Sequence, residues 1–97
     1  MIKHIVMWKF KEGTEAKQKE FLDGLVSLKG KISEIIDVEV GQSIGADNEH
    51  DAILVSTFAS MEALEAYKVH PEHVKVAAIC ADIRVSRVAF DYETDAI

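Results

Sequence analysis

Two histidines and a tyrosine in the second half of the chain carry the side chains needed for proton transfer. Tyr67, His70 and His73 lie close together in the sequence, around Pro71, the only proline. An imidazole takes up or releases a proton near neutral pH, and a phenol hydroxyl can donate a hydrogen bond to a developing oxyanion. These residues are therefore the first candidates for a catalytic or binding site.

Pro71 determines how these side chains are arranged. Leu64 and Tyr67 lie three residues apart, so a short amphipathic helix carries Tyr67 on its apolar side. A residue before proline is pushed out of the helical region, whereas proline suits the first turn of a helix. We therefore expect one helix to end at His70 and another to begin at Pro71, with His73 in its opening turn. This break can direct Tyr67 and His73 toward the same volume.

The same corner is also compatible with a structural role. Clustered titratable groups indicate a functional site only in some proteins, so Tyr67 and His73 are candidates for packing as well as for a pocket. We expect His70 to form a structural hydrogen bond beside the break, and we also include it among the residues expected to line a cavity there. Glu72, in the first turn of a helix, suits the positive end of the helix dipole and is expected at the surface.

Length, composition and charge narrow the classes of protein. The chain has 97 residues, of which 48% are hydrophobic, and we expect a single domain over residues 1–97 with a loose tail at residues 91–97. The net charge is −6 and no basic run occurs, so neither nucleic acid nor a membrane is an expected partner. The single Cys80 cannot form an internal disulfide, and neither a metal nor another cofactor is expected.

The hydrophobic segments are too short to cross a membrane. A span needs about 18 or more consecutive apolar residues, and no segment of the sequence reaches that length. The first ten residues alternate between the two faces of a strand and do not form the continuous apolar run with a cleavage site that marks a signal peptide. Together with the lone cysteine, this pattern favours a cytoplasmic protein.

The hydrophobic periodicity predicts the order of the elements. We expect strands at residues 2–10, 35–42, 51–58 and 83–90, and helices at residues 15–31, 61–70 and 71–81. The order is β-α-β-β-α-β with a broken second helix. It predicts an α+β, ferredoxin-like fold in which helices cover one face of an antiparallel four-stranded sheet.

The strands carry apolar residues on both faces. His4, Val6 and Trp8 share one face of the first strand, with Leu54 on the matching face of the third. The opposite, open face is predicted to hold Ile5, Met7, Ile53 and Val55, together with some of Val38, Val40, Val85 and Val88. An exposed apolar patch of that size usually marks an interface. We therefore predict a symmetric homodimer in which two open sheet faces meet.

Three segments resemble a known family. The stretches HIVMWKF (residues 4–10), DAILV (residues 51–55) and HPEHV (residues 70–74) are similar in order and spacing to the stress-responsive dimeric α/β-barrel (Dabb) family. The resemblance covers residues 2–90 and implies a ferredoxin-like monomer whose sheet pairs with that of a twin copy to form a barrel. It also implies a role in the stress response.

One plant branch of that family consists of polyketide cyclases. The resemblance implies that His73 stands where that branch has its general base and Tyr67 where it has an assisting tyrosine. The branch also has a histidine that matches His4. A further histidine of the branch falls at Ala52 in this chain, so part of that site is missing.

The sequence leaves three hypotheses about a small cavity around His4, Tyr67 and His73. The residues expected to line this cavity are Val6, Trp8, Leu54 and His70. A cofactor-free enzyme, cyclase-like or monooxygenase-like, would use His73 as general base and Tyr67 as hydrogen-bond donor, with help from His4. A binding protein would hold a hydrophobic or aromatic small molecule without converting it.

The third hypothesis is structural. In that case the dimer itself is the function, and a buried histidine–tyrosine network orders the helix break. A lone histidine on an apolar strand face, such as His4, is more often a hydrogen-bonded core residue than a catalyst. Neither the activity nor the ligand follows from the sequence.

Overall fold

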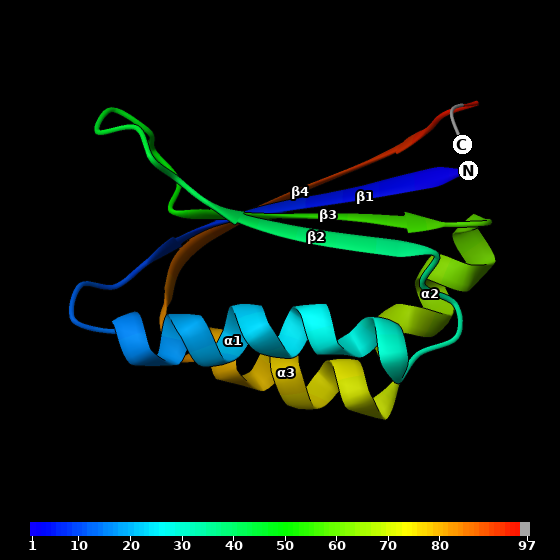
Figure 1. Cartoon of the computed structure of the whole chain (residues 1–97), viewed down its shortest axis with the longest axis horizontal. Coiled ribbons are helices and arrows are strands. Elements are labelled where there is room, and N and C mark those ends of the chain that lie inside the picture. Colours follow the sequence, from blue (N-terminus) through cyan, green and yellow to red (C-terminus); the bar gives the residue numbers. More distant parts are fainter. Residues whose placement is uncertain (96–97) are drawn as a thin grey trace.

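The computed structural model describes residues 1–95 and contains the elements in the predicted order. They are β1 (Ile2–Phe10), α1 (Glu15–Ser27) with a 3-10 turn η1 (Leu28–Gly30), β2 (Asp37–Gln42), β3 (Ala52–Phe58), α2 (Met61–Val69), α3 (Pro71–Ala81) and β4 (Arg84–Glu93). The strands form one antiparallel sheet in the order β2-β3-β1-β4 (Figure 1). The fold is therefore the ferredoxin-like α+β fold that the periodicity predicts.

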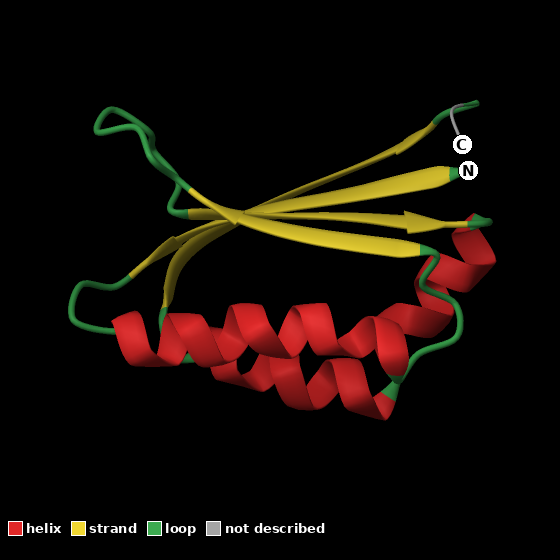
Figure 2. Cartoon of the chain, in the orientation of Figure 1, coloured by secondary structure: helices red, strands yellow, loops and turns green. Residues whose placement is uncertain are grey.

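The helices lie on one face of the sheet. Helices α1 and α3 run side by side beneath it, and α2 lies at the end of the sheet where β3 finishes (Figures 1 and 2). No other element of residues 1–95 covers the opposite face (Figure 2). None of the helices in this part of the chain is both long enough and apolar enough to span a membrane.

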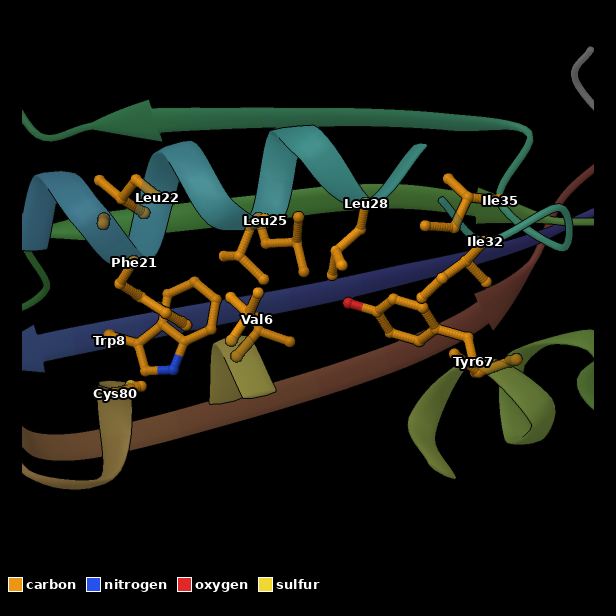
Figure 3. Close-up of a cluster of buried hydrophobic side chains, with 14 of the residues drawn as sticks. Val6, Trp8, Phe21, Leu22, Leu25, Leu28, Ile32, Ile35, Tyr67 and Cys80 are labelled. Carbon is orange, nitrogen blue, oxygen red and sulfur yellow. The ribbon is translucent and has the colours of Figure 1, made fainter. Parts of the chain in front are cut away.

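The core lies between the sheet and the helices. The alternating residues of β1 that face the helices are buried, and α1 contributes Phe21, Leu22 and Leu25 from its apolar side (Figure 3). Phe58 from β3 and Leu64 from α2 are completely buried. Burying a side chain of this size contributes roughly 1.5–3 kcal/mol, so this layer holds the helices against the sheet.

The break at Pro71 has the predicted geometry. Ser60 begins α2 by accepting a hydrogen bond from the backbone N–H of Ala63, and α2 ends at Val69. His70 has extended backbone angles, as expected before a proline, and Pro71 occupies the first turn of α3. The local sequence at Pro71 therefore accounts for the end of α2 and the start of α3.

Strand β4 is longer than predicted. It continues to Glu93, which is paired with Ile2, so residues 91–93 belong to the sheet and the expectation of a loose tail from residue 91 is wrong for them. The backbone groups of Thr94 and Met1 also exchange hydrogen bonds of 2.9 and 3.1 Å. The full length of β1 thus provides backbone partners for this segment. Ala96 and Ile97, the end of the expected tail, lie outside the described residues.

The open face differs in part from the expected one. Val38 and Val40 pack against the core, because they pair with Ser56 and Leu54 on the face that the helices cover. Val88 does lie on the open face, opposite Met7. Strand β4 adds aromatic residues that the shorter predicted strand did not include, and the apolar side chains of the open face are Ile5, Met7, Ile53, Val55, Val88, Phe90 and Tyr92.

Candidate functional site

A cavity of about 130 Å³ lies between the sheet and the helices. It brings together six residues predicted from the sequence, namely His4, Val6, Trp8, Leu54, Tyr67 and His73. His70 is not among the residues that line it. The cavity is also lined by Cys80, Arg84 and Arg87, which the sequence analysis did not assign to the site.

Larger depressions of the surface lack this combination of groups. One of about 310 Å³ lies beside the loop between β2 and β3 and is lined by Met7, His50 and Ile53, among others. Two of these, Met7 and Ile53, belong to the open sheet face. This depression contains neither the phenol of Tyr67 nor the imidazoles of His4 and His73. The smaller cavity that contains them is therefore the better candidate for a catalytic site.

Tyr67 is the central polar group of the cavity. Its side chain is 2% exposed, and its ring centroid lies 4.4 Å from that of His73 and 6.2 Å from that of His4. Figure 3 shows its oxygen pointing into the interior, toward Val6. The hydroxyl has no hydrogen-bond partner among residues 1–95. Burial raises the pKa of Tyr67 to about 12, despite an opposing effect of Arg87, so the phenol stays protonated and can donate.

His73 is held by the end of the preceding helix. Its Nδ1–H donates to the backbone carbonyl of Lys68 at 3.0 Å, because a carbonyl can only accept. The helix end leaves this carbonyl without its usual partner, since the N–H of Glu72 donates instead to Nδ1 of His70 at 3.1 Å. The hydrogen bond assigns the proton of the neutral ring to Nδ1 and leaves Nε2 as an acceptor.

The surroundings of His73 favour the neutral imidazole. Burial lowers the pKa of His73 below its ordinary value of 6.5; the Lys68 carbonyl opposes this effect, while His4 and Arg87 add to it. A neutral imidazole with a free Nε2 can act as a general base near pH 7. The electrostatic environment therefore suits proton abstraction.

His70 has a different role from the one expected for a cavity residue. Its ring caps the first turn of α3 by accepting from the N–H of Glu72, which is the structural hydrogen bond expected beside the break. Because that contact directs the ring to the start of α3, the prediction that His70 lines the cavity is corrected. Glu72 is the acidic residue in the first turn of α3, as expected.

His4 is paired with a residue that the sequence analysis missed. Its Nδ1 lies 2.5 Å from Oδ1 of Asp91, which stands directly opposite it in the β1–β4 pairing. The carboxylate accepts from Nδ1–H, so the neutral ring of His4 also presents Nε2 as its free nitrogen. Asp91 lies in the segment expected to be a loose tail, although the alternation of Ala89, Phe90, Asp91 and Tyr92 is typical of a longer strand.

Cys80 is not prepared to act as a nucleophile in this cavity. Burial raises the pKa of its thiol, and the opposing charges of Arg84 and Arg87 do not reverse the shift. A thiol above its ordinary pKa is mostly protonated at neutral pH, and the reactive form is the thiolate. Among residues 1–95 no group of three or more His, Cys, Asp or Glu side chains is placed to hold a metal ion.

Comparison with known proteins identifies relatives over nearly the whole chain. Residues 2–94 match the family model of the Stress responsive A/B Barrel Domain. Olivetolic acid cyclase from Cannabis sativa is 33% identical over 95 residues, which cover 94% of this chain and 94% of that protein. The stress-response A/B barrel domain-containing protein HS1 from Arabidopsis thaliana is 28% identical over 100 residues, covering 99% and 92%.

A solved structure agrees with the described fold. The crystal structure of a dimeric protein of unknown function with a ferredoxin-like fold, from Bacteroides fragilis, superimposes with a TM-score of 0.90. The two sequences are 31% identical, and the superposition covers 96% of this chain and 95% of the chain from Bacteroides fragilis. The similarity therefore extends over the helices and strands that build the cavity.

We expect acid to destabilise the protein through His73. Because burial lowers its folded-state pKa below 6.5, the unfolded chain binds more protons there, and the free energy of unfolding falls as pH drops below about 6.5 toward the folded-state pKa. Urea unfolding at about pH 7.5 and 5 measures this slope. His73→Asn should make it shallower, and His50→Asn, outside the cavity, should not. An equal slope in wild type and His73→Asn would contradict this account.

The His4–Asp91 hydrogen bond is expected to stabilise the fold. Asp91→Ala leaves the buried Nδ1–H of His4 without an acceptor, which should cost about 1–3 kcal/mol. Asp91→Asn retains an acceptor oxygen and should cost less. Asp23→Ala removes an exposed ion pair with Lys19 and serves as the control, with a change within about 0.5 kcal/mol. Urea unfolding distinguishes these values, and equal losses for Asp91→Ala and Asp23→Ala would refute the assignment.

Proposed function

The chain belongs to the stress-responsive A/B barrel domain family, and from this we propose that it is an acid–base enzyme acting on a small carbonyl compound. The reaction is removal of a proton from a carbon next to the carbonyl group, inside the cavity around His73, Tyr67 and His4. The observation that carries the proposal is the pairing of a free imidazole nitrogen with a free phenol hydroxyl. The rings of His73 and Tyr67 are 4.4 Å apart, and neither Nε2 nor the hydroxyl has a hydrogen-bond partner among the described residues.

His73 serves as the general base. Its Nδ1–H is committed to the Lys68 carbonyl, so Nε2 takes the proton from carbon and the C–H electrons move into an enolate. The carbonyl of Lys68 then stabilises the imidazolium through the same hydrogen bond. Proton return from Nε2 to carbon, or to the product, restores the neutral ring.

Tyr67 stabilises the enolate oxygen. Its hydroxyl remains protonated because burial raises its pKa to about 12, and it has no competing acceptor among residues 1–95. A donor already in place in an apolar cavity lowers the energy of the oxyanion without reorganisation of solvent. His4, oriented by Asp91, holds the other side of Tyr67 and completes the polar part of the site.

The size of the cavity favours a small substrate. Sites for drug-sized ligands enclose roughly 300–1,000 Å³, whereas this one encloses about 130 Å³. Olivetolic acid cyclase supports the proposal of an enzyme of the cyclase type, since it is 33% identical. Ala52, where the plant cyclase branch has a further histidine, argues against an identical reaction.

Hydrogen–deuterium exchange at carbon tests the proposed reaction. Small ketones and 1,3-dicarbonyl compounds are incubated with the protein in D2O, and loss of the C–H signal is followed by proton NMR. His73→Asn keeps an N–H near the position of Nδ1 for the Lys68 carbonyl but removes the base, so we expect exchange to fall by about 10²–10⁴-fold. Tyr67→Phe should lower it by about 10²–10³-fold.

Matched controls separate the enzyme from its alternatives. His50→Asn changes a histidine outside the cavity and should exchange at the wild-type rate. Unfolding curves of every variant check that the fold persists. Exchange that persists unchanged in folded His73→Asn would refute the assignment of the base. Saturable binding with no exchange would instead identify a binding protein, and neither binding nor exchange would favour a purely structural role.

We also propose that the open sheet face forms a homodimer. The partly exposed side chains of Ile5, Met7, Ile53 and Val55 adjoin the aromatic rings of Phe90 and Tyr92 on that face. Removal of such apolar surface from water favours association. The dimeric relative from Bacteroides fragilis, at 31% identity, supports this arrangement.

A charge on the open face is expected to separate the two copies. Val88 on β4 is 47% exposed, and Val74 on α3 is 54% exposed on the helical side of the fold. Val88→Glu buries a carboxylate in the proposed interface and should shift the protein toward monomer, whereas Val74→Glu should leave the dimer intact. Analytical ultracentrifugation over a range of concentrations measures both. A monomeric wild type, or equal effects of the two substitutions, would contradict the proposed interface.

A further inference from the structure

The arginines of this chain are concentrated at one place. Arg84 and Arg87 are the only arginines in the sequence, and both line the cavity that contains His73 and Tyr67. The lysines, which supply the other positive charges, do not line it. Although the chain has a net charge of −6, the cavity therefore has a positive rim. A local field of that sign raises the concentration of anions at a cleft even on an acidic protein.

An irregularity in the sheet brings the two arginines to the same side. Residues three apart in a regular strand point to opposite faces. The β1–β4 pairing shifts between Lys9 and Phe10, so that Phe10 is opposite Arg84 while Lys9 is opposite Ser86. The extra residue, Val85, turns Arg84 to the helical side, which Arg87 shares with Trp8. Bulges of this kind often direct a side chain toward a functional site.

Both guanidinium groups lack an ionic partner in the described part of the chain. No carboxylate of residues 1–95 forms a salt bridge or a side-chain hydrogen bond with Arg84 or Arg87. Asp91, the nearest acidic residue within β4, is hydrogen-bonded to His4 instead. The two residues are exposed, so they remain hydrated while the cavity is empty and can pair with an incoming anion.

The charge of Arg87 reaches the reacting groups. Burial lowers the pKa of His73 and raises that of Tyr67, and Arg87 contributes to the first shift and opposes the second. An anion bound by Arg87 would thus lie within electrostatic reach of the base and the donor. The positive charge of Arg87 would also stabilise the negative charge that develops on a substrate during proton removal.

We propose that Arg84 and Arg87 bind the carboxylate of a small oxo acid whose carbonyl end reaches Tyr67 and His73. This inference rests on the proposed acid–base function and specifies its substrate class. The guanidinium group matches a planar carboxylate with paired N–H donors, and the apolar wall formed by Val6, Trp8 and Leu54 accommodates the carbon chain.

A carboxylate fits this site better than a phosphate ester. Phosphate sites commonly add a lysine or a set of backbone N–H groups at a helix N-terminus. The cavity is lined by no lysine, and its permanently charged side chains are the two arginines. The small volume of about 130 Å³ also favours a compact oxo acid over a phosphorylated metabolite.

Matched pairs of ligands test the inference. Oxo acids of increasing chain length are compared with their amides, which have nearly the same shape and the same ketone but no charge at neutral pH. Binding to the full chain is measured by isothermal titration calorimetry at about pH 7.5, where the carboxylate is ionised. We expect the acid to bind about 10- to 100-fold more tightly than its amide, as charge-assisted hydrogen bonds would produce.

Variants then locate the source of the preference. Arg87→Gln and Arg84→Gln should each reduce the ratio of acid to amide affinity about tenfold or more, and Arg87→Lys should restore part of it. Lys9→Gln removes the same charge from an exposed residue of β1 outside the cavity and should leave the ratio unchanged. His73→Asn should also preserve the ratio, because the arginines remain.

The outcomes separate this inference from the proposed function. Equal affinity for acid and amide, or an acid preference that survives both arginine substitutions, would overturn the carboxylate site. Tighter binding of inorganic phosphate than of every oxo acid would overturn the choice of carboxylate. Exchange of the neutral amides at the ketone, lost in His73→Asn, would still support the acid–base function in each of those cases.

Discussion

The hydrogen bond between His73 and the end of α2 connects the fold of this protein to its proposed chemistry. Pro71 cannot continue the helix, and the N–H of Glu72 is taken by His70, so the Lys68 carbonyl needs another donor. His73 supplies it through Nδ1. The requirement to satisfy a helix end thereby fixes the orientation and the tautomer of the imidazole. Its second nitrogen remains free beside Tyr67.

A structural and a chemical role are thus compatible in the same side chain. His73 and His4 each use Nδ1 for a hydrogen bond within the fold, to Lys68 and to Asp91, and each keeps Nε2 free in the neutral ring. A side chain fixed by such a hydrogen bond has less conformational freedom to lose on binding the proposed substrate. The ring centroid of Tyr67 lies 4.4 Å from that of His73 and 6.2 Å from that of His4, and its hydroxyl has no such bond among residues 1–95.

The sheet separates two different kinds of surface. Its helical face holds a small cavity in which His4, Tyr67 and His73 lie among apolar residues, and Arg84 and Arg87 add positive charge at the rim. Its open face carries aliphatic and aromatic side chains without a covering element in residues 1–95. Strand β4 contributes to both faces of the sheet. Asp91 pairs with His4 of the helical face, whereas Phe90 and Tyr92 lie on the open face.

Local patterns in the sequence were sufficient to predict the element order, the helix break at Pro71 and the approach of Tyr67 to His73. Each depends on residues close together in the chain, where periodicity and the geometry of proline decide the outcome. The pairing of His4 with Asp91, the inward side of Val38 and Val40, and the shared side of Arg84 and Arg87 depended on the tertiary structure. Strand register and a bulge set these features, and both arise from pairing between distant segments, which periodicity within one segment does not specify.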